Sequence, residues 1–172
     1  KLLHKAFAVA KRVRTETTIG NRAVSVSFVA VELAKKIFAQ LDEREVLIIG
    51  AGEMCELAAQ QLVRAGVKRV LVTNRSWERA TALAERFHGE SVPFADLHQV
   101  LLRADIVISS TGSPDFVVNR EAVSAIIRKR RNRPLFFIDI AVPRDIDPQV
   151  NAIDNVYLYD IDDLQEVAEA NM

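Results

Sequence analysis

The stretch EVLIIGAGEMCELAAQQL, residues 45–62, decides the fold. It opens with a continuous apolar run that ends at Gly50, as expected for a strand buried on both faces of a sheet. Beyond Gly52 the apolar residues recur at the three- and four-residue spacing of an amphipathic helix. A strand that passes through a glycine turn into a helix is the opening unit of a doubly wound α/β sheet.

The same alternation continues along the chain. Five further strands are predicted at RVLVTN (69–74), SVPF (91–94, a weak strand or extended link), DIVISSTG (105–112), PLFFIDIA (134–141) and NVYLYD (155–160). Helical spacing is found over residues 28–41, 54–65, 77–87, 94–104 and 122–127, with Phe28 and Trp77 expected on the inner faces of their helices. Strands that alternate with helices predict a doubly wound parallel sheet of the Rossmann type, with flanking linker helices.

Composition narrows the class of protein. The chain has 172 residues, which is enough for one domain with a core of its own, and its formal net charge is zero. A neutral chain has no overall field that attracts nucleic acid or anionic membranes. A single cysteine excludes an internal disulfide framework and fits a reducing compartment, and no apolar run is long enough to suggest a membrane span. We therefore expect a cytoplasmic protein with no membrane partner.

The glycine turn predicts a dinucleotide site. In such sites the first glycine permits the tight turn, the second lets the backbone approach a pyrophosphate, and amides at the helix N-terminus bind the charge. The predicted pyrophosphate loop consists of Gly50, Ala51, Gly52, Glu53, Met54 and Cys55.

Cys55 stands where a third small residue usually allows close packing of helix on strand. A position at a helix N-terminus could lower the pKa of the thiol and make it reactive. Cysteine is also small and comfortable when buried, and phosphate is expected to occupy the helix end. The spacer interpretation is therefore favoured over a reactive thiol.

The end of the second predicted strand indicates which dinucleotide binds. NAD sites usually present a carboxylate there to the ribose hydroxyls, whereas this chain has Asn74, Arg75 and Ser76. A guanidinium can pair with a 2′-phosphate, so NADPH is predicted as the cofactor. The alternative is that Arg75 is a solvated loop residue.

The segment SSTGSP follows the fourth predicted strand, and its Thr111, Gly112 and Ser113, together with Ser110, are expected to line the same crevice. An ordinary strand-to-helix turn would also suit Gly112 and Pro114, and the two interpretations stay open.

The remaining polar clusters are interpreted as structural. The basic run at residues 128–133 is expected to be a solvated face at a helix C-terminus, although tRNA contact is an alternative. Asp139, Asp145 and Asp147 surround Arg144, which predicts a loop-bracing ion pair in preference to a metal site. The three histidines have no metal-like spacing, so no metal site is predicted. No residue is nominated as a catalytic acid or base.

Several segments together resemble the glutamyl-tRNA reductase family. They include VLIIGAGEMCELAAQQL, VTNRSWERATALAERF, ADIVISSTGSP and, most specifically, IDIAVPRDIDP and NVYLYDIDDL. The resemblance covers nearly the whole chain, but only the central NADPH-binding domain of the family. It implies three parts: residues 1–23 as the end of a preceding helix and linker, 24–160 as the NADPH domain, and 161–172 as the start of a C-terminal dimerisation helix.

The resemblance implies that the full-length enzyme reduces glutamyl-tRNA through an enzyme thioester to glutamate-1-semialdehyde, in tetrapyrrole biosynthesis. It further implies a homodimer, with glutamate-1-semialdehyde aminomutase as a conceivable partner. The family's nucleophilic cysteine lies in a domain that this chain does not resemble, so the chain alone is expected to be inactive. Two alternatives stay open: another NADP-dependent domain such as a shikimate dehydrogenase-like one, or a nucleotide-sensing module without turnover.

Overall fold

The structure is a computed structural model that describes residues 20–171. The helix tail expected in the first 19 residues lies outside this range, as does residue 172. Six parallel strands form one sheet in the order β3-β2-β1-β4-β5-β6. The strands are β1 (Glu45–Gly50), β2 (Arg69–Thr73), β3 (Glu90–Ser91), β4 (Ile106–Ser110), β5 (Leu135–Asp139) and β6 (Val156–Asp160). The strand order reverses between β1 and β4, which confirms the predicted doubly wound sheet.

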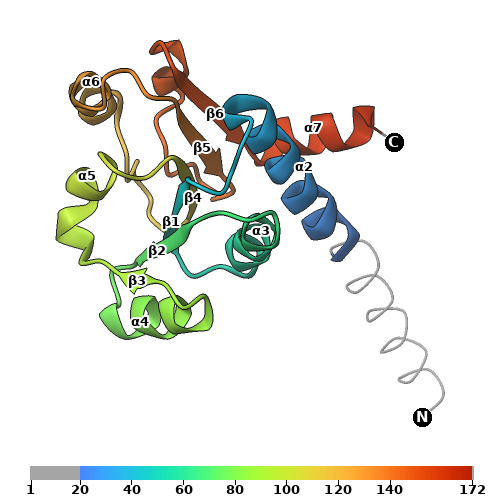
Figure 1. Ribbon diagram of the computed structural model, residues 1–172, viewed down its shortest axis with the longest axis horizontal. Helices are drawn as coiled ribbons and strands as arrows, with labels where there is room; N and C mark the ends of the chain where they lie inside the picture. Colours follow the sequence, from blue (N-terminus) through green and yellow to red (C-terminus); the bar gives the residue numbers. More distant parts are fainter. Residues whose placement is uncertain (1–19, 172) are drawn as a thin grey trace.

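Helices cover both faces of the sheet (Figure 1). One face carries α2 (Gly20–Phe38), α3 (Glu53–Arg64), α4 (Trp77–Arg86) and α7 (Ile161–Ala170), and the other carries α5 (Leu97–Val100), α6 (Arg120–Lys129) and η3 (Pro148–Ala152), while the 3₁₀ turn η2 (Phe94–Asp96) leads into α5. Both faces of the strands are apolar because both are covered. In β1, Val46 and Ile48 pack toward the first layer, whereas Leu47 and Ile49 pack toward the second.

The sequence pattern misplaced three features. Phe28 and Trp77 were expected on inner helix faces, yet they are 62% and 51% exposed. Helical spacing places each residue near the edge of its apolar stripe, and packing decides on which side it falls. The third strand is shorter than SVPF, since it covers Glu90–Ser91 only.

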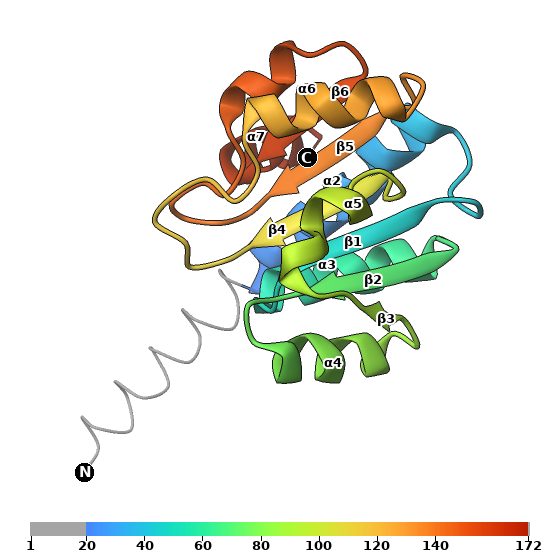
Figure 2. The same cartoon turned by 90° about the vertical axis from the view of Figure 1, so that its left-hand side faces the viewer.

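The carboxyl ends of the parallel strands lie together at one side of the molecule (Figure 2). The β1–α3 turn and the β4–α6 loop therefore meet at the position where the strand order reverses. Within residues 20–171, no helix combines the length and the apolarity that a bilayer crossing requires.

Candidate functional site

Two glycines bring the β1–α3 turn directly against the end of β4. Gly50 has a φ of +103°, which L side chains rarely adopt, and a Cβ there would overlap the Ser110 carbonyl oxygen. A Cβ on Gly52 would lie 2.5 Å from Ser110 Oγ. A residue larger than glycine at position 50 would push the turn away from β4, whereas at position 52 it would first displace the Ser110 hydroxyl, so Gly50 is the residue that the close approach requires.

The N-terminus of α3 differs from those of three other described helices. Side chains of Ser76, Asn119 and Asp160 cap α4, α6 and α7, and Asp160 forms a complete capping box with Asp163. Gly52 at the start of α3 provides no side-chain cap. The first-turn amides of α3, which belong to Glu53, Met54 and Cys55, therefore lack a side-chain acceptor at the N-cap, and their dipole favours an anion.

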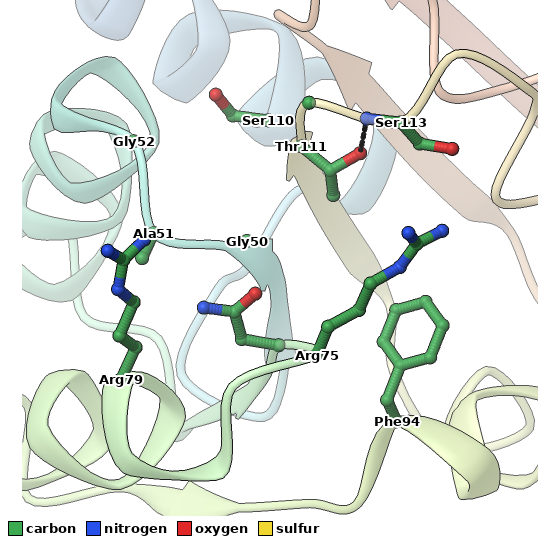
Figure 3. A pocket seen from close by; sticks show the side chains of 11 residues that line it. Gly50, Ala51, Gly52, Arg75, Arg79, Phe94, Ser110, Thr111 and Ser113 are labelled. Atoms are coloured by element: carbon green, nitrogen blue, oxygen red, sulfur yellow. Dashed lines mark hydrogen bonds between the residues drawn. The ribbon is translucent and has the colours of Figure 1, made fainter.

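A cavity of about 420 Å³ opens at this turn (Figure 3). Its lining residues come from the β1–α3 turn, the end of β2 with the start of α4, η2, and the β4–α6 loop: Gly50, Ala51, Gly52, Asn74, Arg75, Arg79, Phe94, Ser110, Thr111, Gly112 and Ser113. The structure thus brings together nine of the thirteen predicted site residues. Four predicted residues, Glu53, Met54, Cys55 and Ser76, do not line it.

Two cations and one aromatic ring form the part of the cavity beyond β2. The Arg75 guanidinium carbon lies 5.7 Å from the centroid of the Phe94 ring, and Arg79 extends from α4 toward Ala51 (Figure 3). No Asp or Glu is among the residues that line the cavity. The lining is therefore cationic, which suits a phosphate.

Sequence reasoning missed Arg79 and Phe94. Arg79 had a signal, because it stands in the first turn of the predicted helix, directly after the Asn74–Ser76 loop. Phe94 had none, since its position depends on how β3 and η2 return to the sheet. Ser76, by contrast, accepts a hydrogen bond from the Arg79 N–H as the cap of α4.

The hydroxyl groups of the β4–α6 loop bind partners within the protein, either in the loop itself or in the connection after β5. The Thr111 hydroxyl donates to Asp145 Oδ1 at 2.5 Å and accepts from the Ser113 N–H at 3.2 Å. The Ser113 hydroxyl donates to the Asp115 carbonyl at 2.8 Å. This loop consequently forms a braced wall of the cavity.

Cys55 is fully buried between α3 and the sheet. Its thiol donates to the Ile108 carbonyl at a sulfur–oxygen distance of 3.6 Å. Burial, with smaller contributions from Asp145 and Glu56, raises the pKa of the Cys55 thiol far above its ordinary range. A buried, protonated thiol agrees with the spacer interpretation and argues against a nucleophile.

Two interpretations of charged clusters need correction. Arg144 does not brace the acidic cluster: it pairs with Asp160 at 3.2 Å and Asp162 at 2.7 Å. Asp139 instead braces the loop after β5 by accepting hydrogen bonds from its backbone N–H groups, and Asp145 accepts from the Thr111 N–H of the β4–α6 loop. The basic run is only partly a solvated face, because the Arg130 side chain is buried beneath it.

Comparison with known proteins places this geometry in a family. A model of the shikimate / quinate 5-dehydrogenase family matches residues 32–167, which is most of the chain. The chain belongs to that family. This membership of a dehydrogenase family, together with the glycine turn, indicates a nicotinamide cofactor.

Glutamyl-tRNA reductases are similar to this family member over its whole length. The enzyme of Geobacter metallireducens is 60% identical over 172 residues, which is 100% of this chain and 40% of that protein. The glutamyl-tRNA reductase of Syntrophobacter fumaroxidans is 60% identical over 99% of this chain and 37% of that protein. The predicted resemblance is therefore confirmed, and the chain spans about 40% of the length of these relatives.

Solved structures show the same similarity to glutamyl-tRNA reductases and to the dehydrogenase fold. Glutamyl-tRNA reductase from Methanopyrus kandleri has a TM-score of 0.81 and 43% identity, covering 98% of this chain and 42% of that one. Shikimate dehydrogenase from Aquifex aeolicus has a TM-score of 0.57 at 18% identity, covering 82% of this chain and 51% of that one, and shows the shared fold alone.

Proposed function

We propose that this chain is the NADPH-binding domain of a glutamyl-tRNA reductase. The observation that carries the proposal is the 60% identity to glutamyl-tRNA reductases over all 172 residues. The cavity at the strand-order reversal supports it, because its lining offers two arginines and the Gly50–Gly52 turn that leads into the uncapped N-terminus of α3.

Different residues of the cavity would bind different parts of the cofactor. The Gly50–Gly52 turn and the first amides of α3 would hold the pyrophosphate, since Gly52 leaves those amides without a side-chain cap. Arg75 and Arg79, with Asn74 beside them, would hold the 2′-phosphate, and Phe94 supports the Arg75 guanidinium. The loop at Thr111, Gly112 and Ser113 would border the ribose and nicotinamide.

When bound, NADPH supplies the hydride that reduces an enzyme-bound glutamyl thioester to glutamate-1-semialdehyde. The domain orients the cofactor, and none of its residues is assigned as a nucleophile, acid or base. Cys55 cannot serve as the thiolate, because burial keeps it protonated. We therefore assign the nucleophile to the part of the enzyme outside this chain, and expect the chain alone to be inactive.

The wider assignment follows from the same proposal. We infer a cytoplasmic homodimer in tetrapyrrole biosynthesis that acts on glutamyl-tRNA, with glutamate-1-semialdehyde aminomutase as a candidate partner. The proposed division keeps residues 24–160 as the NADPH domain and 161–172 as the start of the dimerisation helix.

A titration of the full-length protein with NADPH and NADH tests the cofactor assignment. A guanidinium contact to a charged phosphate contributes about 1.5–3 kcal/mol, so NADPH should bind about tenfold to a hundredfold more tightly than NADH. Equal dissociation constants would refute the assignment of Arg75 and Arg79 to the 2′-phosphate. Failure to bind either nucleotide would refute the cofactor site itself.

A further inference from the structure

Asp145 is fully buried in the connection between β5 and η3, and it does not line the cavity. Both of its carboxylate oxygens nevertheless accept hydrogen bonds from the β4–α6 region. Ser109 Oγ donates to Oδ2 at 2.6 Å, the Thr111 N–H donates to Oδ2 at 2.8 Å, and Thr111 Oγ1 donates to Oδ1 at 2.5 Å. Thr111 is therefore held by both its backbone and its side chain.

The backbone of Asp145 binds the other end of the same loop. Its carbonyl accepts from the N–H groups of Val117 at 2.6 Å and Val118 at 3.1 Å. One residue thus holds the loop at its first position after β4 and again just before α6. The loop between these points includes Gly112 and Ser113, which line the cavity.

Asp145 is itself fixed to the end of β5. Asp139 Oδ2 accepts from the N–H groups of Asp145 at 3.0 Å and Ile146 at 2.9 Å, and Asp139 Oδ1 accepts from the Ala141 N–H at 3.1 Å. Because β5 pairs with β4 in the sheet, this chain of contacts connects a rigid strand to the cavity wall.

The Thr111 hydroxyl shows how the effect would reach the cavity. Its proton is directed at Asp145, so its oxygen is free to accept from the Ser113 N–H at 3.2 Å. The Thr111 methyl group is then turned toward the Gly50 turn. Without the Asp145 acceptor the hydroxyl could rotate, and both the Ser113 contact and the methyl position would change.

We propose that Asp145 is a positioning residue for the cofactor site, acting through Thr111 on the β4–α6 loop without touching the cofactor. The proposal rests on the proposed function, because it concerns the wall of the same cavity. It assigns a role in binding to the DIAVPRDID segment, which otherwise contributes no residue to the cavity lining. A carboxylate is required because two oxygens accept from three donors, whereas an amide offers one accepting oxygen.

The test uses the full-length protein and the dissociation constant for NADPH, measured by nicotinamide fluorescence well below the melting temperature. Asp145→Asn and Thr111→Val should each raise Kd about tenfold, the equivalent of one lost charged hydrogen bond. The double variant should bind no more weakly than the weaker single variant, within about twofold, because both changes remove one interaction. Thr111→Ser, which keeps the hydroxyl, should bind more tightly than Thr111→Val.

Asp105→Asn is the matched control, because Asp105 is also a buried carboxylate but lies at the opposite edge of the sheet, where it accepts from the Glu45 N–H. It should lower the melting temperature and leave Kd for NADPH within about twofold of wild type. Unchanged binding by Asp145→Asn and Thr111→Val, or effects that multiply in the double variant, would overturn the proposal. If Asp145→Asn does not fold, the difference between Thr111→Val and Thr111→Ser decides. Wild-type protein that binds neither NADPH nor NADH would instead refute the proposed function.

Discussion

The two edges of the parallel sheet each carry arginines, and Arg130 at one edge differs from Arg75 and Arg79 at the other in what surrounds it. At the amino edge, where the strands begin, Arg130 and Asp105 are buried and bind partners within the protein. At the carboxyl edge, Arg75 and Arg79 line an open cavity beside an α3 N-terminus that has no side-chain cap. Partners that come from within stabilise a fold, whereas groups directed at open space are available to a ligand.

At the amino edge, the two terminal nitrogens of the buried Arg130 guanidinium donate to several backbone carbonyls, whereas its Nε has no partner. Arg130 donates hydrogen bonds to the carbonyls of Leu101, Leu102, Ala104 and Pro134, at 2.9, 3.2, 2.5 and 2.9 Å. It also lies 3.6 Å from Asp105. Burial, and next the nearby Arg133, lower the pKa of Arg130 to about 10, so the side chain stays protonated at pH 7. These carbonyls close the turns before β4 and β5, which makes Arg130 a structural cation.

The largest expected effect comes from removing that cation. Arg130→Ala leaves the Asp105 carboxylate buried with only the exposed Arg133 as a pairing cation, and it leaves several turn carbonyls without their donor. Breaking a buried pair by removing one partner costs about 3–5 kcal/mol. The free energy of unfolding, measured in urea, should therefore fall by that amount. Because the cavity lies at the other edge, the folded fraction should bind NADPH with the wild-type Kd. A change in Kd would show that the two edges are coupled.

Gly50 tests the carboxyl edge in the same way, with Gly66 as its control. Both have φ near +100°, but a Cβ on Gly50 would overlap the Ser110 carbonyl, whereas a Cβ on Gly66 meets no atom within 4 Å. Gly66→Ala should cost about 1–2 kcal/mol from backbone strain alone. Gly50→Ala should cost about 1–3 kcal/mol more, because the turn must move off β4.

Gly50→Ala should also weaken NADPH binding, while Gly66→Ala should not. Urea unfolding and a fluorescence titration of both variants measure the two effects. Equal losses of stability would mean that the close approach of the turn to β4 has no energetic consequence.

The sequence predicted the two edges unequally, for a physical reason. Apolar strands and the glycine turn follow from local patterns, so the sheet and the Gly50–Gly52 loop were predicted correctly. The burial of Arg130 could not be predicted, because its partners come from turns about 30 residues away in the chain. A charged run reads the same in sequence whether its members are solvated or buried.

The cavity residues that lie in loops directly after a strand were predicted. Those that reach the cavity only because the fold brings distant segments together were missed. Arg75 and Thr111 stand at strand ends, which the strand pattern locates. Phe94 reaches the cavity only through the path of η2, and Asp145 reaches Thr111 only because β4 and β5 are neighbours. Neighbouring strands are a property of sheet order, which a single sequence does not state.

Helix α4 carries one arginine that lines the cavity and another that has a partner within the protein. Arg79 lines the cavity, whereas Arg86, in the last turn of α4, pairs with Glu56 on α3. Arg79→Met should raise Kd for NADPH about tenfold to a hundredfold and change Kd for NADH far less, since only NADPH carries the 2′-phosphate. Arg86→Met should leave both constants unchanged. Calorimetric titration of each variant with each nucleotide gives the four ratios, and a similar loss for both nucleotides would place Arg79 on the pyrophosphate instead.

Substitution of Cys55 gives the smallest expected effect. It tests whether this residue at the N-terminus of α3 contributes to cofactor binding or only to packing. Cys55→Ala removes one buried sulfur atom and should cost about 1 kcal/mol of stability, with Kd for NADPH unchanged.

The raised pKa of the buried Cys55 thiol also makes stability depend on pH. In the unfolded chain a thiol ionises near pH 8.5, whereas Cys55 in the folded protein keeps its proton, so its contribution to stability is complete below about pH 8.5 and declines as the pH rises above that value. The free energy of unfolding should therefore change less between pH 7 and pH 10 in Cys55→Ala than in wild type. Rapid modification of native Cys55 by a thiol reagent, or loss of NADPH binding in Cys55→Ala, would assign this residue to the cofactor site after all.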